Sequence, residues 1–168
     1  MTYSPPSANA PSLRDAVADD SPAIVALVRA LAAHIGDVSL AKVTPEGLAA
    51  ALAAPDPLCR AVVAESAKGD IVGVCLYSVI FSTWVGAPGL FVIDLYVKNE
   101  ARKSQLGRLL LTAAAREGRV RGCRFIRLDV DARNRLAEGF YLRLGFQKLD
   151  GDSSFLLKAE AFDALAGA

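Results

Sequence analysis

The sequence predicts a mixed α/β fold of the α+β kind, with one domain over residues 12–168 after a flexible tail over residues 1–11. Two observations support this prediction. Short runs rich in Val, Ile, Leu and Phe, which are typical of strands, alternate with longer stretches whose apolar residues recur at helical spacing. The 168 residues, 53% of them hydrophobic and 22% charged, are enough for one packed core. No apolar run approaches the roughly 20 residues of a membrane span, so we expect no membrane partner.

Residue types at the element boundaries justify the expected order of elements. Asp20 or Ser21, Thr44 and Asn134 are typical N-caps of helices. Gly145 is a typical residue just past a helix end. The expected elements are a strand (13–17), two helices (21–35 and 45–54), two strands joined by a hairpin turn (60–65 and 71–81), a loop (82–89), a central strand (90–97), a long helix (104–121), a strand (124–130), a helix (135–144), two closing strands (146–149 and 154–158) and a last helical stretch (159–166).

A basic turn, residues 98–104, lies between the central strand and the long helix. Free backbone N–H groups at a helix start, together with the helix dipole, make a site for an anion. Residues 98–148 hold 13 basic and 5 acidic side chains, although the whole chain has a net charge of only +1. This local excess indicates either a phosphate-bearing ligand or a solvated helix face. It does not indicate a general surface for nucleic acid.

The numbers and spacing of cysteine and histidine limit the kinds of catalytic and metal site that the chain can form. Cys59, Cys75 and Cys123 are far apart and odd in number, which favours free thiols in a reducing cytoplasm. No CxxC pair occurs and His34 is the single histidine, so we expect neither a metal site nor a His-dependent triad. The first twelve residues lack the pattern of a secretory signal. We therefore expect a cytoplasmic protein.

Two motifs resemble a known family. Residues 102–107 read Arg-Lys-Ser-Gln-Leu-Gly, which matches the pattern Arg/Gln-x-x-Gly-x-Gly/Ala except at Gln105. Downstream, Asn134, Ala137, Phe140-Tyr141 and the run Leu-Gly-Phe at 144–146 follow a second pattern. The chain thus resembles the GNAT superfamily of acetyl-CoA-dependent N-acyltransferases. Residues 71–97 look most like its diamine and thialysine acetyltransferase branch.

The resemblance implies roles for individual residues. It assigns Tyr141 as the general acid that protonates the leaving thiolate. Asp94 is expected to contact the substrate and to be either the base, acting through water, or a buried carboxylate that pins a neighbouring loop. The second candidate for the base is a backbone carbonyl with a water chain. Trp84 is either a lid over an acceptor pocket or part of the core, and Asn134 caps its helix, binds the cofactor, or does both. The implied cofactor-binding residues are Leu95, Tyr96, Val97, Arg102, Lys103, Ser104, Gln105, Leu106, Gly107, Arg108 and Asn134.

Two departures from the branch shape the functional prediction. The branch usually has Gly at 105, and we expect Gln105 to be tolerated with a negative φ in the first helical turn. The branch also has Glu at 93, whereas Ile93 and Ser82 supply no carboxylate for a polyamine. We therefore expect acetyl transfer from acetyl-CoA to the primary amine of a small-molecule or amino-acid-like acceptor other than a polyamine, by a homodimer. The alternative is a CoA-binding sensor or interaction module with little or no turnover. A nucleotide-binding phosphate loop is disfavoured because no GK[ST] follows the turn.

Overall fold

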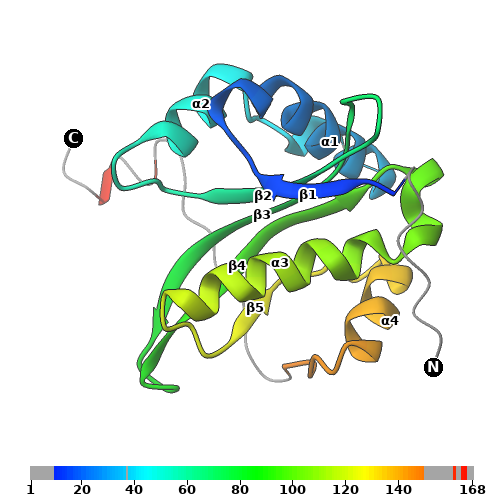
Figure 1. The fold of residues 1–168 in the computed structure, drawn as a ribbon. Helices are drawn as coiled ribbons and strands as arrows, with labels where there is room; N and C mark the ends of the chain where they lie inside the picture. The colour runs from blue at the N-terminus through cyan, green and yellow to red at the C-terminus, as the bar shows by residue number, and fades with distance from the viewer. Residues whose placement is uncertain (1–9, 37, 150–160, 162–163, 166–168) are drawn as a thin grey trace. The chain divides into compact units, whose positions relative to one another are not determined.

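The computed structural model describes residues 10–36, 38–149, 161 and 164–165. Contacts divide the chain into two compact units, Met1–Arg133 and Asn134–Ala168. In the described part of the first unit, five strands form one sheet in the order β1-β2-β3-β4-β5 (Figure 1). The strands are β1 (Ser12–Asp15), β2 (Arg60–Glu65), β3 (Ile71–Ser82), β4 (Ala87–Val97) and β5 (Ile126–Leu128). The helices of this unit are α1 (Ser21–His34), α2 (Pro45–Ala53), α3 (Leu106–Val120) and the short 3-10 helices η1 (Ala18–Asp20), η2 (Val38–Leu40) and η3 (Asn99–Ser104). The second unit contains α4 (Arg135–Arg143).

The sheet is mixed, which confirms the predicted fold class. β1, β2, β3 and β4 pair antiparallel in chain order, and β5 pairs parallel to β4. Helices α1 and α2 cover one face of the sheet and α3 covers the other (Figure 1). On the first face, Ile24 and Leu27 of α1 join Leu48 of α2 in one buried cluster with the sheet. None of the described helices has the length and apolar composition needed to cross a membrane.

The start of α2 follows its predicted capping residue, whereas the start of α1 does not. The Thr44 hydroxyl accepts a hydrogen bond from the Gly47 N–H at 3.1 Å, and Pro45 opens α2 as predicted. Asp20 occupies the N-cap position of α1, but its side chain makes no capping bond there. Its carboxylate instead accepts two bonds from the Arg14 guanidinium, at 2.7 and 2.8 Å, and one from the Val17 N–H at 2.8 Å. Asp20 therefore ties β1 to the start of α1 rather than capping the helix.

The hairpin between β3 and β4 is longer than the sequence indicates. The loop expected over 82–89 is wrong, because β4 already begins at Ala87. A tight turn closes the hairpin, with the Gly86 N–H donating to the Ser82 carbonyl at 2.8 Å. Gly89 is not a turn residue: a Cβ there would lie 2.4 Å from the Phe125 ring. Its lack of a side chain lets that ring pack against the strand.

The second unit consists, in its described part, of α4 and its two ends. The Asn134 side chain accepts a hydrogen bond from the Ala137 N–H at 3.1 Å, as predicted for an N-cap. Gly145 has a φ of +90°, and the Phe146 N–H donates to the Tyr141 carbonyl at 3.1 Å. Phe146 thus completes the C-cap of α4, and the strand predicted over 146–149 is wrong. The strand predicted over 154–158 and most of the stretch 159–166 lie outside the described residues.

Candidate functional site

On the side of β4 that faces β5, the backbone beyond Val92 has no strand partner among the described residues. β5 pairs only with Leu90–Val92, so it is shorter than the predicted strand over 124–130. From Ile93 to Val97 the structure shows no strand partner on this side among the residues it describes. Backbone N–H and C=O groups on an open edge can pair with an extended ligand. Leu95, Tyr96 and Val97, all predicted to contact a cofactor, belong to this segment.

The turn after β4 ends in a left-handed residue. Gln105 joins η3 to α3 with φ 56° and ψ 17°, so the predicted negative φ is wrong. The residue lies at the junction between two helices and not inside the first turn of α3, and the left-handed conformation redirects the chain there. A residue other than glycine pays about 1–2 kcal/mol for this conformation. This explains why glycine suits the position.

The N-terminus of α3 fits an anionic group. The N–H groups of its first turn, at Leu106, Gly107 and Arg108, have no carbonyl of their own helix to bond. No acidic side chain lies in that turn, so the positive end of the helix dipole is not neutralised. The exposed Arg108 adds a cation. The side chains of Lys103 and Ser104 lie outside the described part of the structure.

Arg102 fixes the turn to the strand. Its Nε donates to the Val97 carbonyl at 2.9 Å. Its guanidinium carbon lies 5.4 Å from the centre of the Tyr96 ring, within the range of a cation–π contact. Arg102 therefore holds the anion-binding turn against the end of β4, in addition to carrying positive charge.

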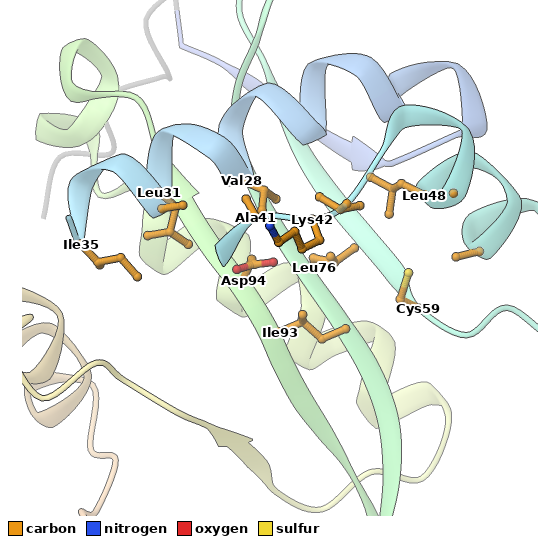
Figure 2. A pocket seen from close by; sticks show the side chains of 14 residues that line it. Val28, Leu31, Ile35, Ala41, Lys42, Leu48, Cys59, Leu76, Ile93 and Asp94 are labelled. Carbon is orange, nitrogen blue, oxygen red and sulfur yellow. The ribbon is translucent and has the colours of Figure 1, made fainter. Parts of the chain in front are cut away.

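A cavity of about 450 Å³ lies between α1, α2 and the sheet (Figure 2). Its walls are mainly aliphatic, with Val28 and Leu31 of α1, Leu48 of α2 and Leu76 of β3 among them. Asp94 and Lys42 are the charged side chains among the described residues that line it. The cavity can therefore take a ligand that is largely apolar and carries charge at defined points.

A β-bulge directs two consecutive residues of β4 to this cavity. Tyr77 pairs with Val92, but the next residue back, Leu76, pairs with Asp94. Ile93 is therefore an extra residue without a partner on β3. Ile93 and Asp94 both line the cavity (Figure 2), whereas regular alternation would turn one of them to the opposite face.

The Asp94 carboxylate is half-buried at the cavity. No hydrogen bond or ion pair to it occurs within the described ranges, so the structure does not support the alternative that Asp94 pins a loop. Desolvation by burial raises the pKa of Asp94. Burial and, to a smaller extent, the charge of Asp94 raise the pKa of the neighbouring Cys75 thiol to about 12. That thiol therefore stays protonated.

Trp84, Tyr141 and Asn134 were also predicted to belong to the site. Trp84 is 98% exposed in the turn between β3 and β4, so it is not a core residue, and it does not line the cavity. Tyr141 lies on α4 in the second unit, where its ring packs edge-on against Phe140 and Phe146 at centroid distances of 5.1 and 5.4 Å. Asn134 caps the same helix. The roles predicted for Tyr141 and Asn134 in catalysis and cofactor binding stay predictions.

Lys42 is the residue at the cavity that the sequence did not reveal. It lies between η2 and α2, in a segment without a motif. A single lysine in a connection is ordinarily a solvated surface residue. Only the packing of α1 and α2 on the sheet shows that this one borders a cavity. Among the described residues, no group of His, Cys, Asp and Glu side chains is arranged to hold a metal ion.

The chain is similar to proteins of known classification. The model of the acetyltransferase (GNAT) family matches residues 29–146. The thialysine N-epsilon-acetyltransferases of Sus scrofa and Bos taurus are 32% and 33% identical over 165 residues, which cover 92% of this chain and 96% of each relative.

Solved structures support the fold alone, because their sequence identities are low. An integron cassette protein from the mobile metagenome of V. cholerae superposes with a TM-score of 0.75 at 15% identity, covering 95% of this chain and 99% of that one. An aminoglycoside acetyltransferase from an uncultured soil metagenomic sample, in complex with sisomicin, superposes with a TM-score of 0.70 at 19% identity, covering 88% of this chain and 97% of that one.

Proposed function

The chain belongs to the acetyltransferase (GNAT) family and is an acyl-CoA-dependent N-acetyltransferase, so we propose that it transfers the acetyl group of acetyl-CoA directly to the primary amine of a small-molecule or amino-acid-like acceptor. The observation that carries this proposal is the arrangement of β4. Beyond Val92, one side of β4 has no strand partner among the described residues; this stretch begins beside Asp94, whose carboxylate lines a mainly apolar cavity. One strand therefore offers a backbone ligand site and a proton acceptor at adjacent residues.

Acetyl-CoA fits the groups that surround this edge. The amides of its extended pantetheine arm match the backbone of Leu95 and the N–H of Val97, on the side of β4 without a described strand partner; the Val97 carbonyl already accepts a bond from Arg102. Its pyrophosphate suits the N–H groups of residues 106–108 and the positive charge of Arg102 and Arg108. Residues 103–105, which form the approach to these N–H groups, complete the proposed cofactor site. When bound, acetyl-CoA supplies a thioester as the acyl donor.

The acceptor amine must lose a proton before it attacks. An amine with a pKa near 10.4 requires about 4.6 kcal/mol for deprotonation at pH 7. We assign Asp94 as the acceptor of that proton, through a water molecule. The desolvation that raises its pKa makes the carboxylate a stronger base than an exposed aspartate.

The proposed transfer uses one base, Asp94, and one acid, Tyr141. The amine nitrogen forms a bond to the thioester carbonyl carbon, and the bond from that carbon to sulfur breaks. The proton of the ammonium form passes to Asp94 and then to solvent before the attack, and the second proton that the nitrogen loses, as the amide forms, also passes to solvent. The Tyr141 phenol donates a proton to the leaving thiolate and recovers one from solvent.

The cavity supports an acceptor with few charges. A polyamine requires several acidic groups, and Asp94 is the carboxylate among the described lining residues. The Ser82 hydroxyl accepts a hydrogen bond from the Val85 N–H in the hairpin turn and supplies no negative charge. The relatives named for thialysine favour an amino-acid-like acceptor over a polyamine.

The test has two stages. Calorimetry with CoA measures the cofactor site, and release of the CoA thiol from acetyl-CoA over a panel of primary amines measures transfer. We expect both binding and release. Binding without release on any amine would leave the sensor alternative, and no binding would refute the placement of the cofactor.

We also propose that the enzyme is a cytoplasmic homodimer. The hairpin end exposes Phe81 and Trp84, by 67% and 98%, together with Val85. Large apolar side chains gathered on one exposed element favour a protein contact. The described cysteines are free thiols, which suits a reducing compartment. Sedimentation velocity should give about twice the chain mass of 17.7 kDa, and a monomer at micromolar concentration would refute the dimer.

A further inference from the structure

We propose that Lys42 is itself an acceptor of the acetyl group, so that the enzyme modifies its own cavity when no free amine is bound there. This inference rests on the proposed transfer from acetyl-CoA to a primary amine. It adds a modification site on the chain, an acetylated Nζ at position 42, that the proposed function does not require. The chemistry fits, because a lysine side chain ends in a primary amine.

The first observation is the position of the Lys42 amine. Lys42 lines the same cavity as Asp94, the proposed base, and these two are the charged side chains among the described lining residues. In Figure 2 the Lys42 nitrogen points toward the Asp94 carboxylate. The chain therefore presents a primary amine of its own to the group that deprotonates the acceptor amine in the proposed mechanism.

The second observation is that no partner holds this amine in place. Lys42 and Asp94 form no ion pair, and neither side chain has a hydrogen bond or ion pair to another residue within the described ranges. Lys148, by contrast, pairs with Glu138 at 2.9 Å. Lys42 is exposed in the connection between η2 and α2. Its flexible four-carbon stem lets the amine reorient from the carboxylate to a bound thioester.

The third observation is the apolar lining that surrounds the carboxylate. Val28 and Ile93 line the cavity together with Asp94 (Figure 2), and burial raises the pKa of Asp94. An apolar lining penalises the charged carboxylate, so it favours transfer of a proton from a nearby ammonium to Asp94. That transfer leaves the neutral amine, which is the form that attacks a thioester.

The step balances in atoms and protons. The Lys42 ammonium passes one proton to Asp94, which returns it to solvent. The amine nitrogen then forms a bond to the thioester carbonyl carbon of acetyl-CoA. The bond from that carbon to sulfur breaks, and the departing thiolate is protonated as in the proposed transfer. The nitrogen loses its second proton to solvent as the amide forms. The product is a neutral acetamide, so the cavity loses the charge of Lys42.

The test follows acetylation of individual lysines by peptide mass spectrometry. The full chain is incubated with acetyl-CoA without any added amine, and the gain of an acetyl group is measured over time at Lys42 and at Lys68. Lys68 is the matched control, because it is exposed in the turn between β2 and β3 and does not line the cavity. The measurement is repeated with Asp94→Asn and at several enzyme concentrations. Thiol release over the amine panel tests the proposed function separately.

Lys42 should be acetylated faster than Lys68 by about 10²-fold or more, because a general base assists the reaction only at Lys42. Asp94→Asn should slow acetylation of Lys42 by a similar factor and leave Lys68 unaffected. The rate constant at Lys42 should not depend on enzyme concentration, since the amine and the bound donor belong to one chain. Without an added amine, wild type and Lys68→Arg should release a burst of CoA thiol no larger than the amount of enzyme, and Lys42→Arg should lack it.

The two readouts separate this inference from the proposed function. Turnover of free amines without preferential acetylation of Lys42 would overturn the inference and leave the function standing. Selective acetylation of Lys42 without turnover of any amine in the panel would support the inference and count against a small-molecule acceptor alone. Equal rates at Lys42 and Lys68, no acetylation of either, a rate at Lys42 unchanged in Asp94→Asn, or a rate constant proportional to enzyme concentration would each overturn the inference.

Discussion

Replacing Asp94 by asparagine should separate the catalytic from the structural role of this side chain. The change keeps the shape of the residue and removes the carboxylate that accepts the proton in the proposed mechanism. General base catalysis contributes about 10²- to 10⁴-fold to such reactions. We therefore expect kcat/KM for the acceptor amine to fall by about 10²-fold or more at pH 7, while the affinity for CoA is retained.

The pH dependence of this loss is a more specific test. An alkyl amine with a pKa near 10.4 is increasingly neutral as the pH approaches about 10, and it then needs less help from a base. The deficit of Asp94→Asn relative to wild type should accordingly shrink as the pH rises from about 7 to about 10. If the ratio of kcat/KM between wild type and Asp94→Asn stayed constant over this range, Asp94 would not be the group that receives the proton of the amine.

Stability should change in the opposite direction to activity. Burial raises the pKa of Asp94 above its ordinary value of 3.8. Between the ordinary pKa and the raised pKa of the folded state, the folded state holds a proton that the unfolded state has released. The free energy of unfolding therefore falls as the pH rises through this interval. The loss is complete above the folded pKa. Asp94→Asn removes it, so the variant should be more stable than wild type at pH 7 and should match it below the ordinary pKa.

Urea denaturation of both proteins over this range of pH measures the effect. The reasoning depends on the carboxylate having no partner in the described part of the protein. If Asp94→Asn were less stable than wild type at pH 7, the carboxylate would hold bonds that the structure does not show. Asp94 would then be a structural residue, and a different group would have to serve as the base.

Three further variants address the acid and the cofactor site. Tyr141→Phe should slow thiol release by about 10²-fold with little change in CoA affinity, and an unchanged rate would exclude Tyr141 as the acid. Gly107→Val should weaken CoA binding in calorimetry, because a branched side chain crowds the first turn of α3. Undiminished affinity would contradict that placement. Gln105→Gly should raise the free energy of unfolding by about 1 kcal/mol in urea, since it relieves a left-handed φ of 56°. A less stable variant would show that the Gln105 side chain compensates for its backbone.

Most elements could be predicted from local chemistry. Thr44 with Pro45 and Asn134 with Gly145 mark two helices whose caps the structure reproduces. The hairpin of β2 and β3 follows from its turn residues. These signals act over a few residues, and a single sequence contains them in full.

The clearest error arises where a contact between distant residues decides the local structure. Gly89 was expected in a loop, but it lies in β4 because the Phe125 ring packs on it. Gln105 takes a positive φ at the junction where η3 ends and α3 begins. Phe146 is a different case: its N–H bonds the Tyr141 carbonyl five residues back, so a local helix cap, and not a distant contact, replaces the expected strand. The packing partner of Gly89 cannot be identified from residue type alone.

The residues of the candidate site also fall into two groups: those that local motifs indicate and those that only the folded structure reveals. Asp94 and the turn over 102–108 could be found because they belong to motifs with fixed spacing. Lys42 could not be found, since its importance depends on the cavity that α1 and α2 form with the sheet. The bulge at Ile93 was also hidden, because it is a property of the pairing with β3 and not of β4 itself.

The bulge has a consequence for how the enzyme's acceptor range can change. Since positions 93 and 94 both face the cavity, each can present a charged group to the acceptor without altering the pairing on either side of the bulge. An acidic residue at 93 would give the cavity two neighbouring carboxylates, and isoleucine leaves it with one. Under the proposed function, a single substitution at position 93 would change the charge that the cavity presents to the acceptor.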